Sequence, residues 1–341
     1  MIVVMAAGAT PEQIQDVEER IRGWGYGVHP IYGTERTVIG AVGVPEADKA
    51  QYLEQLERLP YVENAIAIIK PYKFVSREFQ KETTRITVRD VQFGGDDVVL
   101  MAGPCTVESY DLTMQTARAV RALGVRVLRG GAYKPCTSPY SFQGLGVEGL
   151  RILRDVADET GMVVITEVMD PRNVERVSSY ADILQIGTRN MQNYDLLREV
   201  GRGSTPVLLK RGMWAKLEEW LQAAEYVVLG GNHNVILCER GVRTFETHTR
   251  NTLDLSAVPA VHDLSNLPVV VDPSQGTGRW SLVPTMARAA VAAGADGLLV
   301  EVHPEPDKAI KDGAQSLTHE GFARLVEMCR PVAEAIGRRL V

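Results

Sequence analysis

The sequence lacks the features that define several large classes of protein. It has no run of about 18 apolar residues, so we expect no membrane-spanning helix. Its four cysteines are widely spaced and form no C-x-x-C pair, which fits a reduced setting better than a disulfide framework. The formal net charge is -6 at pH 7, so no basic footprint indicates a nucleic-acid partner.

The start of the chain also lacks a positively charged segment and a small-residue cleavage pattern. We interpret MIVVMAAGATPEQ as a strand and a turn instead of a signal peptide, and we expect a cytoplasmic protein. An acidic protein that binds anionic substrates must gather its arginines and lysines locally. Clustered cations are therefore the first signal to look for.

Residues 1–70 alternate strand-like and helix-like segments. In the helical segment, Ile14, Val17 and Ile21 recur on one face. The expected order is strand 2–5, helix 11–25, the extended GVHPIYG, strand 36–43, helix 46–59 and strand 62–70. This βαββαβ order predicts a small ferredoxin-like α+β domain. It contains no cluster of catalytic residue types, which leaves open a role in stability, in oligomerisation or in effector binding.

After a polar connector at 71–95, with room for a short hairpin, a strand followed by a helix recurs over 96–341. Eight apolar, β-branched runs mark the strands: 98–105, 126–133, 162–170, 183–188, 206–212, 234–241, 268–275 and 297–304. Such runs alternating with helices indicate a parallel sheet. Eight units in about 250 residues predict an α/β fold of the closed (β/α)8, or TIM barrel, type. A doubly wound sheet is the alternative, but no G-x-G-x-x-G follows the first barrel strand.

The predicted strands end in polar or charged residues, and catalytic groups of TIM barrels lie at these ends. Five cations lie at these strand ends: Arg129, Lys134, Arg189, Lys210 and Arg240. Each alone would be an ordinary solvated charge. Five on one rim of an acidic protein indicate a small anionic ligand with phosphate and carboxylate groups, because arginine binds both in a planar, bidentate manner.

A second group at the same rim combines a thiol with carboxylates. Cys105, Glu301 and Asp312 would repel one another as anions unless a cation joined them, and Gln275 is expected nearby. Such a sulfur and oxygen set suits a divalent transition ion. A buried apolar cysteine beside two salt-bridged acids is the alternative, and the spacing leaves both open.

Long motifs across the chain resemble one enzyme family. They are AGPCTVES (102–109), LRGGAYKPCTSPYSFQG (128–144), ILQIGTRNMQN (183–193), LLKRGM (208–213), LCERGVRTFE (237–246), VVDPSQGTGR (270–279) and VEVHPEPDKAIKDGAQSL (300–317). They resemble 3-deoxy-D-arabino-heptulosonate 7-phosphate (DAHP) synthase of type Iβ, which has an N-terminal ferredoxin-like domain. The related 3-deoxy-octulosonate 8-phosphate synthases share the barrel but differ where KPCTS stands here.

The family condenses phosphoenolpyruvate with erythrose 4-phosphate, the entry step of aromatic amino-acid synthesis. The resemblance implies that phosphoenolpyruvate is held by Arg129, Lys134, Gly187, Thr188, Arg189, Lys210 and Arg240. It implies acceptor contacts from Pro135, Cys136, Thr137, Ser138 and Asp312. It implies a divalent metal ion (Mn²⁺, Fe²⁺, Mg²⁺ or Zn²⁺) on Cys105, Gln275, Glu301 and Asp312. It also implies a homo-oligomer, often a tetramer, and no organic cofactor is expected.

The charges of the substrate predict the mechanism. Phosphoenolpyruvate is a masked enol with a nucleophilic C3, and a metal ion or Lys134 would polarise the aldehyde carbonyl above it. Attack leaves positive charge at C2, where water adds before the hemiketal phosphate loses inorganic phosphate. Glu167 ends the third barrel strand and is the candidate to manage that water. The alternative is that Glu167 only orients Arg189 or Lys210.

Two central positions depart from the family pattern. Cys136 replaces the arginine of K-P-R-[ST]-[ST], which grips the aldose phosphate in the family, and Gln275 replaces the metal-binding histidine of D-P-S-H. Trp280 also replaces a common second arginine. A hydrogen bond to a charged group contributes about 1.5–3 kcal/mol, so we expect acceptor affinity to fall by about 10- to 100-fold. An amide oxygen is a weaker ligand than imidazole and favours Mn²⁺, Fe²⁺ or Mg²⁺.

Three functions therefore stay open. The first is a DAHP synthase that tolerates both changes. The second is a paralogue in a specialised pathway that adds phosphoenolpyruvate to a different aldehyde. The third is a catalytically silent barrel that senses a ligand or binds a partner enzyme such as chorismate mutase. The intact set of five cations argues against the third, and turnover of erythrose 4-phosphate would separate the first two.

Overall fold

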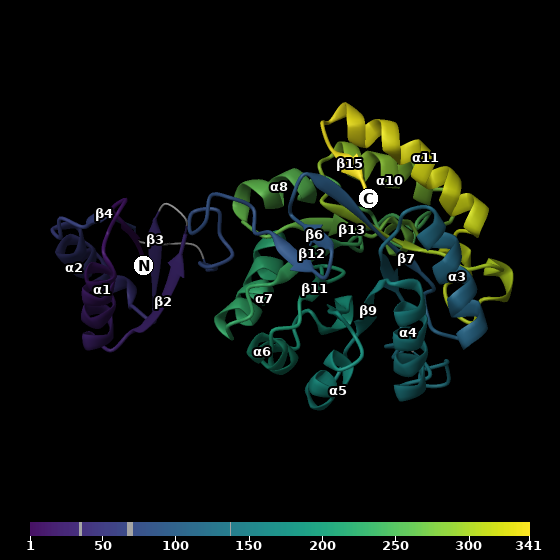
Figure 1. Ribbon diagram of the computed structural model, residues 1–341, viewed down its shortest axis with the longest axis horizontal. Coiled ribbons are helices and arrows are strands. Elements are labelled where there is room, and N and C mark those ends of the chain that lie inside the picture. The colour runs from purple at the N-terminus through teal and green to yellow at the C-terminus, as the bar shows by residue number, and fades with distance from the viewer. Residues whose placement is uncertain (34–35, 67–70, 137) are drawn as a thin grey trace. The chain divides into compact units, whose positions relative to one another are not determined.

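The structure, a computed structural model, describes residues 1–33, 36–66, 71–136 and 138–341. The chain divides into two compact units, Met1–Lys81 and Glu82–Val341 (Figure 1). The first unit holds a four-stranded antiparallel sheet, and the second holds a parallel barrel. Among the described residues, no helix has the length and apolar character needed to cross a membrane.

The first unit has the strand order β2-β3-β1-β4. Its elements are β1 (Ile2–Met5), α1 (Pro11–Gly23), β2 (Gly27–Tyr32), β3 (Thr37–Val42), α2 (Glu46–Glu57) and β4 (Val62–Ile66). Strand β1 pairs with both β3 and β4, which is the arrangement of the predicted ferredoxin-like fold. The predicted last strand runs to residue 70, and its part at 67–70 lies outside the described residues.

Helix α1 begins where the sequence supplies a cap. The Thr10 hydroxyl accepts a hydrogen bond from the Gln13 backbone at 3.4 Å, and the Gln13 side chain accepts one from the Thr10 backbone at 2.9 Å. Pro11 occupies the first helical position, where its missing N–H costs nothing. Val17 and Ile21 of the helix then pack in one buried cluster with β1 and β3, which confirms the predicted apolar face.

In the second unit, which is described throughout except for residue 137, eight parallel strands form a closed ring. They are β7 (Asp97–Gly103), β8 (Val127–Arg129), β9 (Val163–Glu167), β10 (Ile183–Ile186), β11 (Val207–Lys210), β12 (Val235–Glu239), β13 (Val269–Val271) and β14 (Gly297–Glu301). The ring closes where β14 pairs with β7, from Gly297 beside Val99 to Glu301 beside Gly103. This closure confirms the TIM barrel and rules out the open sheet.

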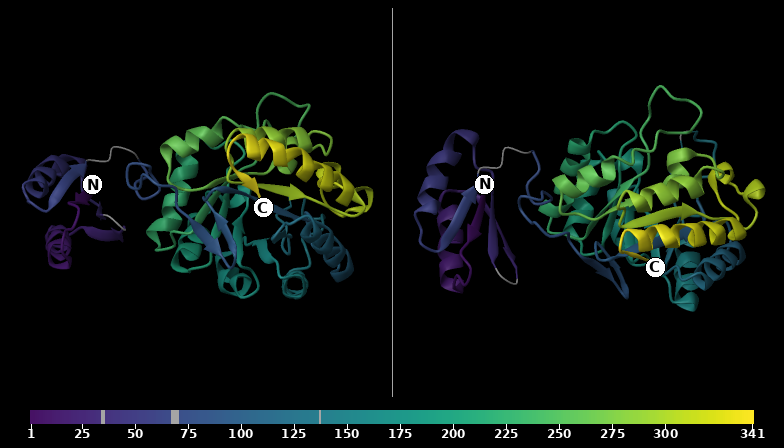
Figure 2. Two further views of the ribbon diagram at one scale, coloured as in Figure 1. Left: turned by 45° about the horizontal axis from the view of Figure 1, so that its top comes forward. Right: turned by 90° about the horizontal axis from the view of Figure 1, so that it is seen from above.

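Helices lie outside the ring of strands (Figures 1 and 2). They are α3 (Tyr110–Ala122), α4 (Val147–Thr160), α5 (Val174–Ser178), α6 (Tyr194–Arg202), α7 (Leu217–Leu229), α8 (Ala257–Leu264), α9 (Pro273–Thr277), α10 (Val283–Ala292) and α11 (His319–Ala335). Short 3-10 helices are η1 (Pro171–Asn173), η2 (Thr188–Asn190), η3 (Pro306–Lys308) and η4 (Gly313–Gln315). The two-residue strand β15 (Arg339–Leu340) pairs with β7. With helices outside and side chains filling the inside, strands β9 to β14 are buried along their whole length, which explains their near-continuous apolar sequence.

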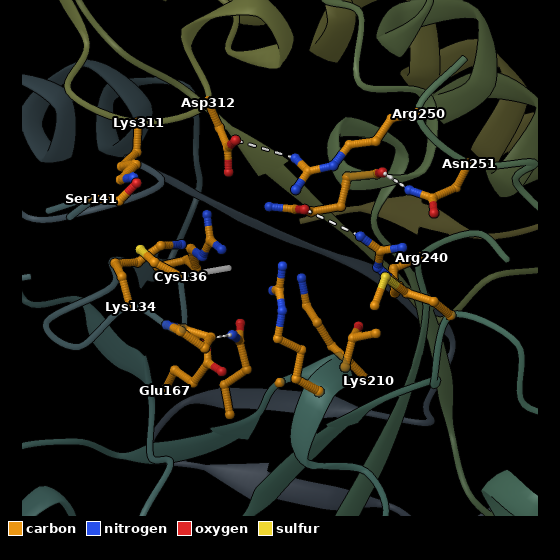
Figure 3. A pocket seen from close by; sticks show the side chains of 18 of the residues that line it. Lys134, Cys136, Ser141, Glu167, Lys210, Arg240, Arg250, Asn251, Lys311 and Asp312 are labelled. Carbon is orange, nitrogen blue, oxygen red and sulfur yellow. Dashed lines mark hydrogen bonds and ion pairs between the residues drawn. The ribbon is translucent and has the colours of Figure 1, made fainter. Parts of the chain in front are cut away.

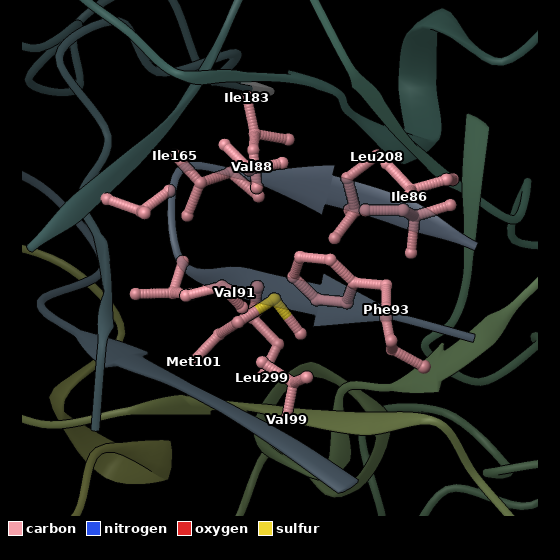
Figure 4. Packing of buried hydrophobic residues seen from close by; sticks show 14 of the residues in the cluster. Ile86, Val88, Val91, Phe93, Val99, Met101, Ile165, Ile183, Leu208 and Leu299 are labelled. Carbon is pink, nitrogen blue, oxygen red and sulfur yellow. The ribbon is translucent and has the colours of Figure 1, made fainter. Parts of the chain in front are cut away.

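A hairpin closes the amino-terminal end of the barrel. It consists of β5 (Ile86–Val88) and β6 (Val91–Phe93), and its four apolar side chains pack against residues that begin the barrel strands (Figure 4). Phe93 is fully buried there, and burying a side chain of this kind stabilises the fold by about 1.5–3 kcal/mol. The hairpin therefore belongs to the barrel unit, although it lies within the segment predicted as a connector.

The opposite, carboxyl-terminal end of the barrel is polar. Arg129, Glu167, Lys210 and Glu301 are the last residues of their strands, and Arg240 follows directly after β12. Because all eight strands are parallel and these residues stand at their carboxyl ends, the charged side chains lie on one rim, as the sequence predicts. The loop at 241–256 stands out from this rim (Figure 2).

Candidate active site

A cavity of about 360 Å³ opens at the carboxyl ends of the barrel strands (Figure 3). Many of the predicted site residues line it: Arg129, Lys134, Pro135, Cys136, Ser138, Glu167, Gly187, Thr188, Arg189, Lys210, Arg240, Gln275 and Asp312. Cys105 and Glu301 are buried and do not line the cavity, but Cys105 is hydrogen-bonded to Lys134 and Glu301 to Gln275. Thr137 lies outside the described residues. The structure thus brings the predicted side chains together, and their individual roles stay predictions.

Two of the buried cations have carboxylate partners. Arg129 donates to Glu301 at 2.6 Å, and Lys210 forms an ion pair with Asp272. Both pairs are almost completely buried, and a buried charge without a partner would be destabilising by several kcal/mol. The partners therefore hold these cations at the cavity wall before any ligand arrives.

Lys134 and Arg240 reach the cavity with neutral partners. The Lys134 ammonium group lies 3.2 Å from the Cys105 carbonyl oxygen and 3.1 Å from its sulfur. Arg240 donates to the Gln275 side-chain oxygen at 3.3 Å, and burial lowers its pKa. Neither cation is ion-paired to a carboxylate of the residues that the structure describes. An anionic ligand in the cavity would supply the missing negative charge.

Glu167 is a buried carboxyl group at the cavity wall. One of its oxygens accepts from the Gln185 side chain at 3.2 Å, and the other has no hydrogen-bond partner among the described residues. Burial raises the pKa of Glu167, against the opposing charges of Lys134 and Lys210. A carboxyl group with a raised pKa and a free oxygen suits proton transfer to or from water.

Gly187 gives Glu167 its space. A Cβ atom at position 187 would lie 1.9 Å from the Glu167 Oε1 atom, closer than any real contact. The backbone φ of Gly187 is -70°, so the need for glycine comes from this close approach and not from the backbone conformation. Gly187, directly after β10, therefore lies against the side chain of Glu167, the last residue of β9, and any side chain at position 187 would displace that carboxyl group.

The thiol and the two carboxylates come together as the sequence suggests. The Cys105 sulfur lies 3.1 Å from the Asp312 carboxylate, and the ligand atoms of Cys105, Glu301 and Asp312 all lie within 4.8 Å of one another. Burial raises the pKa of the Cys105 thiol. Sulfur and carboxylate oxygen are ligands of divalent transition ions, so these three side chains fit one such ion.

Both polar atoms of the Gln275 side chain are hydrogen-bonded to other site residues. Its side-chain nitrogen donates to Glu301 at 2.9 Å, and its oxygen accepts from Arg240 at 3.3 Å. The two partners determine this orientation, because a carboxylate only accepts and a guanidinium only donates. Gln275 therefore bridges the thiol–carboxylate group and the cation group. Its role as a fourth metal ligand stays a prediction.

Several cavity residues were not predicted from the sequence. Arg250 donates to Asp312 at 3.2 Å and to Gln315 at 2.8 Å, and Asn251 donates to the backbone oxygen of Gln275 at 2.9 Å. Lys311 lines the cavity next to Asp312. They come from loops, whose conformation has no sequence period, and loop polarity alone does not separate a lining residue from a solvated one.

Other polar residues of the strand ends lie elsewhere. Arg211 follows Lys210 but bonds to Glu239 and Asp254, both at 2.9 Å, outside the cavity. Adjacent residues of a strand face opposite sides, so only one of this pair of cations reaches the site.

Comparison with known proteins places these residues in a family. Residues 76–336 match the DAHP synthetase I family, and residues 1–70 match the DAHP synthase ferredoxin-like domain. Phospho-2-dehydro-3-deoxyheptonate aldolase of Thermotoga maritima is 50% identical over 337 residues, which is 99% of each chain. The crystal structure of this DAHP synthase from Thermotoga maritima has a TM-score of 0.79 and 49% identity, covering 100% of this chain and 99% of that one.

More distant relatives share the barrel. The 2-dehydro-3-deoxyphosphooctonate aldolase of Syntrophotalea carbinolica is 36% identical over 251 residues, 68% of this chain and 90% of its own. The match to the Thermotoga maritima protein includes the ferredoxin-like unit, and its identity is higher. On its full-length match, its fold and the family motifs gathered around one cavity, the chain belongs to the DAHP synthetase I family.

Proposed function

We propose that the chain condenses phosphoenolpyruvate with erythrose 4-phosphate to give DAHP and inorganic phosphate. The observation that carries this proposal is the row of cations from separate strand ends that lines one cavity beside Glu167. Phosphoenolpyruvate carries a carboxylate and a phosphate, so it needs several positive partners at once. Arg129 and Lys210 are held in place by acids, and Lys134 and Arg240 have charge left for the ligand.

The reaction forms one carbon–carbon bond and breaks one carbon–oxygen bond. C3 of phosphoenolpyruvate attacks the aldehyde carbon, and the aldehyde oxygen gains a proton. Water adds at C2 and loses a proton, which gives a hemiketal phosphate. The bond between C2 and the bridging phosphate oxygen then breaks, the hemiketal hydroxyl passes its proton to the departing phosphate, and the ketone forms. In this proposal Lys134 donates the proton to the aldehyde oxygen and Glu167 takes the proton from water, and the position of both side chains in the wall of one cavity supports these roles.

The site also fits a divalent metal ion. Cys105, Glu301 and Asp312 would hold it, and the ion would act there as a Lewis acid toward the aldehyde carbonyl. Glu301 is already fixed for such a role, because Arg129, Gln275 and Gln315 all donate to its two oxygens. The homo-oligomer implied by the family resemblance stays a prediction, which light scattering in solution tests.

A second candidate function shares the donor and changes the acceptor. The Cys136 thiol donates to the backbone oxygen of Phe142 at 3.2 Å, within its own loop, so position 136 contributes no cation to the cavity. This observation favours an aldehyde other than erythrose 4-phosphate, and it leaves the phosphoenolpyruvate side unchanged.

Phosphate release from phosphoenolpyruvate tests both candidates. The purified protein is given erythrose 4-phosphate or one of a panel of phosphorylated and unphosphorylated aldehydes, and each product mass is measured. The proposal expects fastest release with erythrose 4-phosphate and a product with the mass of DAHP. Release with another aldehyde alone would establish the second candidate and refute the first. No release with any aldehyde, despite phosphoenolpyruvate binding, would refute both.

A further inference from the structure

Lys311 reaches the cavity from a tightly built loop after β14. Asp312, the next residue, has a φ of 55° and a ψ of 27°, a left-handed conformation that turns the chain sharply. A Cβ atom at Gly313 would lie 2.0 Å from the Pro306 carbonyl oxygen, so the two ends of the loop are in close contact. Because of this turn, the consecutive side chains of Lys311 and Asp312 both line the cavity.

Within the part of the chain that the structure describes, no hydrogen bond or ion pair joins the ammonium group of Lys311 to another residue. The neighbouring acid does not neutralise it, because Asp312 accepts from Arg250 at 3.2 Å and from the Cys105 thiol at 3.1 Å. Lys311 is also half-buried, so its charge is partly removed from water. An anion in the cavity would relieve that loss of solvation.

The surroundings of Lys311 supply neutral donors. Figure 3 shows Lys311, Ser141 and Cys136 on one side of the cavity, with Arg240 and Arg250 on the other. Ser138 lines the same cavity, and its oxygen accepts from the Tyr140 backbone at 3.3 Å, which leaves its proton free to donate. Hydroxyl groups with one unpaired cation make a site for a phosphate group.

We propose that Lys311 binds the phosphate group of the aldose acceptor, with Ser138 and Ser141 as hydrogen-bond donors. Lys311 thereby supplies the cation that position 136 does not. The inference rests on the proposed function, since it assumes that the acceptor carries a phosphate. Lysine binds phosphate as a point charge on a flexible stem, so this contact would tolerate a wider range of acceptor lengths than a planar arginine clamp.

Kinetics of Lys311→Met test the proposal, because methionine keeps the stem and removes the charge. The phosphate lies far from the reacting carbon, so the contact is the same in the ground and transition states. We expect KM for erythrose 4-phosphate to rise by about 10- to 100-fold, with kcat and KM for phosphoenolpyruvate nearly unchanged. Lys311→Arg should keep most of the affinity. Unphosphorylated erythrose should react equally well with the natural protein and with Lys311→Met.

Lys308→Met is the matched control. Lys308 lies in the same loop, is exposed and ion-paired to Glu305, and does not line the cavity. This variant should keep the KM of the natural protein. An unchanged KM for erythrose 4-phosphate in Lys311→Met, in a protein with the natural circular dichroism and melting temperature, would overturn the proposal.

A binding experiment separates this inference from the proposed function. Glycerol 3-phosphate has the phosphate but no aldehyde, so it binds without reacting, and calorimetry measures its affinity for the phosphoenolpyruvate-loaded protein. If erythrose 4-phosphate is not turned over but glycerol 3-phosphate binds the natural protein and not Lys311→Met, the proposed function fails and the Lys311 site stands. Equal binding to both proteins, or none to the natural protein, overturns the Lys311 site.

Discussion

The two sides of the cavity hold their charges differently. On the side proposed to bind phosphoenolpyruvate, Arg129, Lys210 and Arg240 are each at most 4% exposed and each is hydrogen-bonded in place. On the acceptor side, Cys136 and Lys311 are half-buried, and the lysine charge is unpaired among the described residues. A fixed cation loses little freedom when its ligand binds, whereas a flexible lysine loses rotamer entropy. We therefore expect the first side to bind one donor, and changes of acceptor at the second side to leave donor binding unchanged.

Removing a cation from the donor side should have the largest effect. Lys134→Ala deletes both a binding charge and the expected proton donor to the aldehyde oxygen. We expect kcat/KM to fall by more than roughly 10³-fold, and phosphoenolpyruvate binding measured by calorimetry to weaken strongly. Lys308→Ala is the control, because this exposed lysine is paired outside the cavity. Unchanged phosphoenolpyruvate affinity in a folded Lys134→Ala protein would contradict the donor-side assignment.

Changing the acid on the donor side should affect the chemical step. Glu167→Gln keeps the shape and removes the base, so we expect kcat to fall by about 10²- to 10⁴-fold with little change in KM. Burial raises the pKa of Glu167 above its ordinary value of 4.5. The natural protein should therefore lose activity as the pH falls through that raised pKa, because protonation removes the base. The pH–rate profile of the variant should lack this decline, and a natural kcat in Glu167→Gln would leave Glu167 a positioning role only.

The role of Gln275, which is hydrogen-bonded to both Arg240 and Glu301, can be tested through metal binding. Gln275→His replaces the amide that joins Arg240 to Glu301 with a nitrogen ligand. We expect affinity for Mn²⁺ to rise by about 10- to 100-fold, the range typical of altered metal surroundings. Metal content after dialysis against a chelator gives the measurement, independently of activity. Equal retention in both proteins would mean that position 275 does not reach the ion.

The smallest effect is expected from adding a second cation to the acceptor side. Cys136→Arg should lower KM for erythrose 4-phosphate by about 10-fold or less and leave kcat unchanged, because the remote phosphate is bound equally in both states. Lys311 already supplies one charge, so the gain is limited. Steady-state kinetics of the single variant and of Cys136→Arg combined with Lys311→Met measure it. A gain that appears only in the double variant would show that the two cations compete for one phosphate.

Much of the fold and of the donor side was predictable from the sequence, and the reason is positional. Buried parallel strands require apolar runs, so the eight runs located the strands, and Lys210 or Glu301 at the end of a run had to lie on the rim. The number of these runs, eight, also predicted the closed barrel that the structure confirms. A short hairpin was expected within the connector at 71–95, but the sequence did not show that the apolar residues of β5 and β6 fill the end of the barrel.

The acceptor side was less predictable because it consists of loops. The Asp312-Gly313 dipeptide indicates a turn, and Asp312 adopts a left-handed conformation there, but the sequence does not indicate that this turn directs Lys311 into the cavity. Arg250 lies within an exposed, polar stretch for which no periodicity exists. The orientation of Gln275 depends on Arg240 and Glu301, which come from different strands, so only the assembled structure shows it.

The hairpin at the amino-terminal end of the barrel also bears on the sequence of binding events. Because it fills that end with packed apolar side chains, we expect substrates to enter the cavity from the opposite rim. Three of the cations expected to bind phosphoenolpyruvate, Arg129, Lys210 and Arg240, end or directly follow their strands. Cys136 and Lys311 belong to the loops that follow β8 and β14. With the binding roles proposed for these residues, we expect phosphoenolpyruvate to add before the aldehyde. Initial-rate kinetics with both substrates varied would test this order.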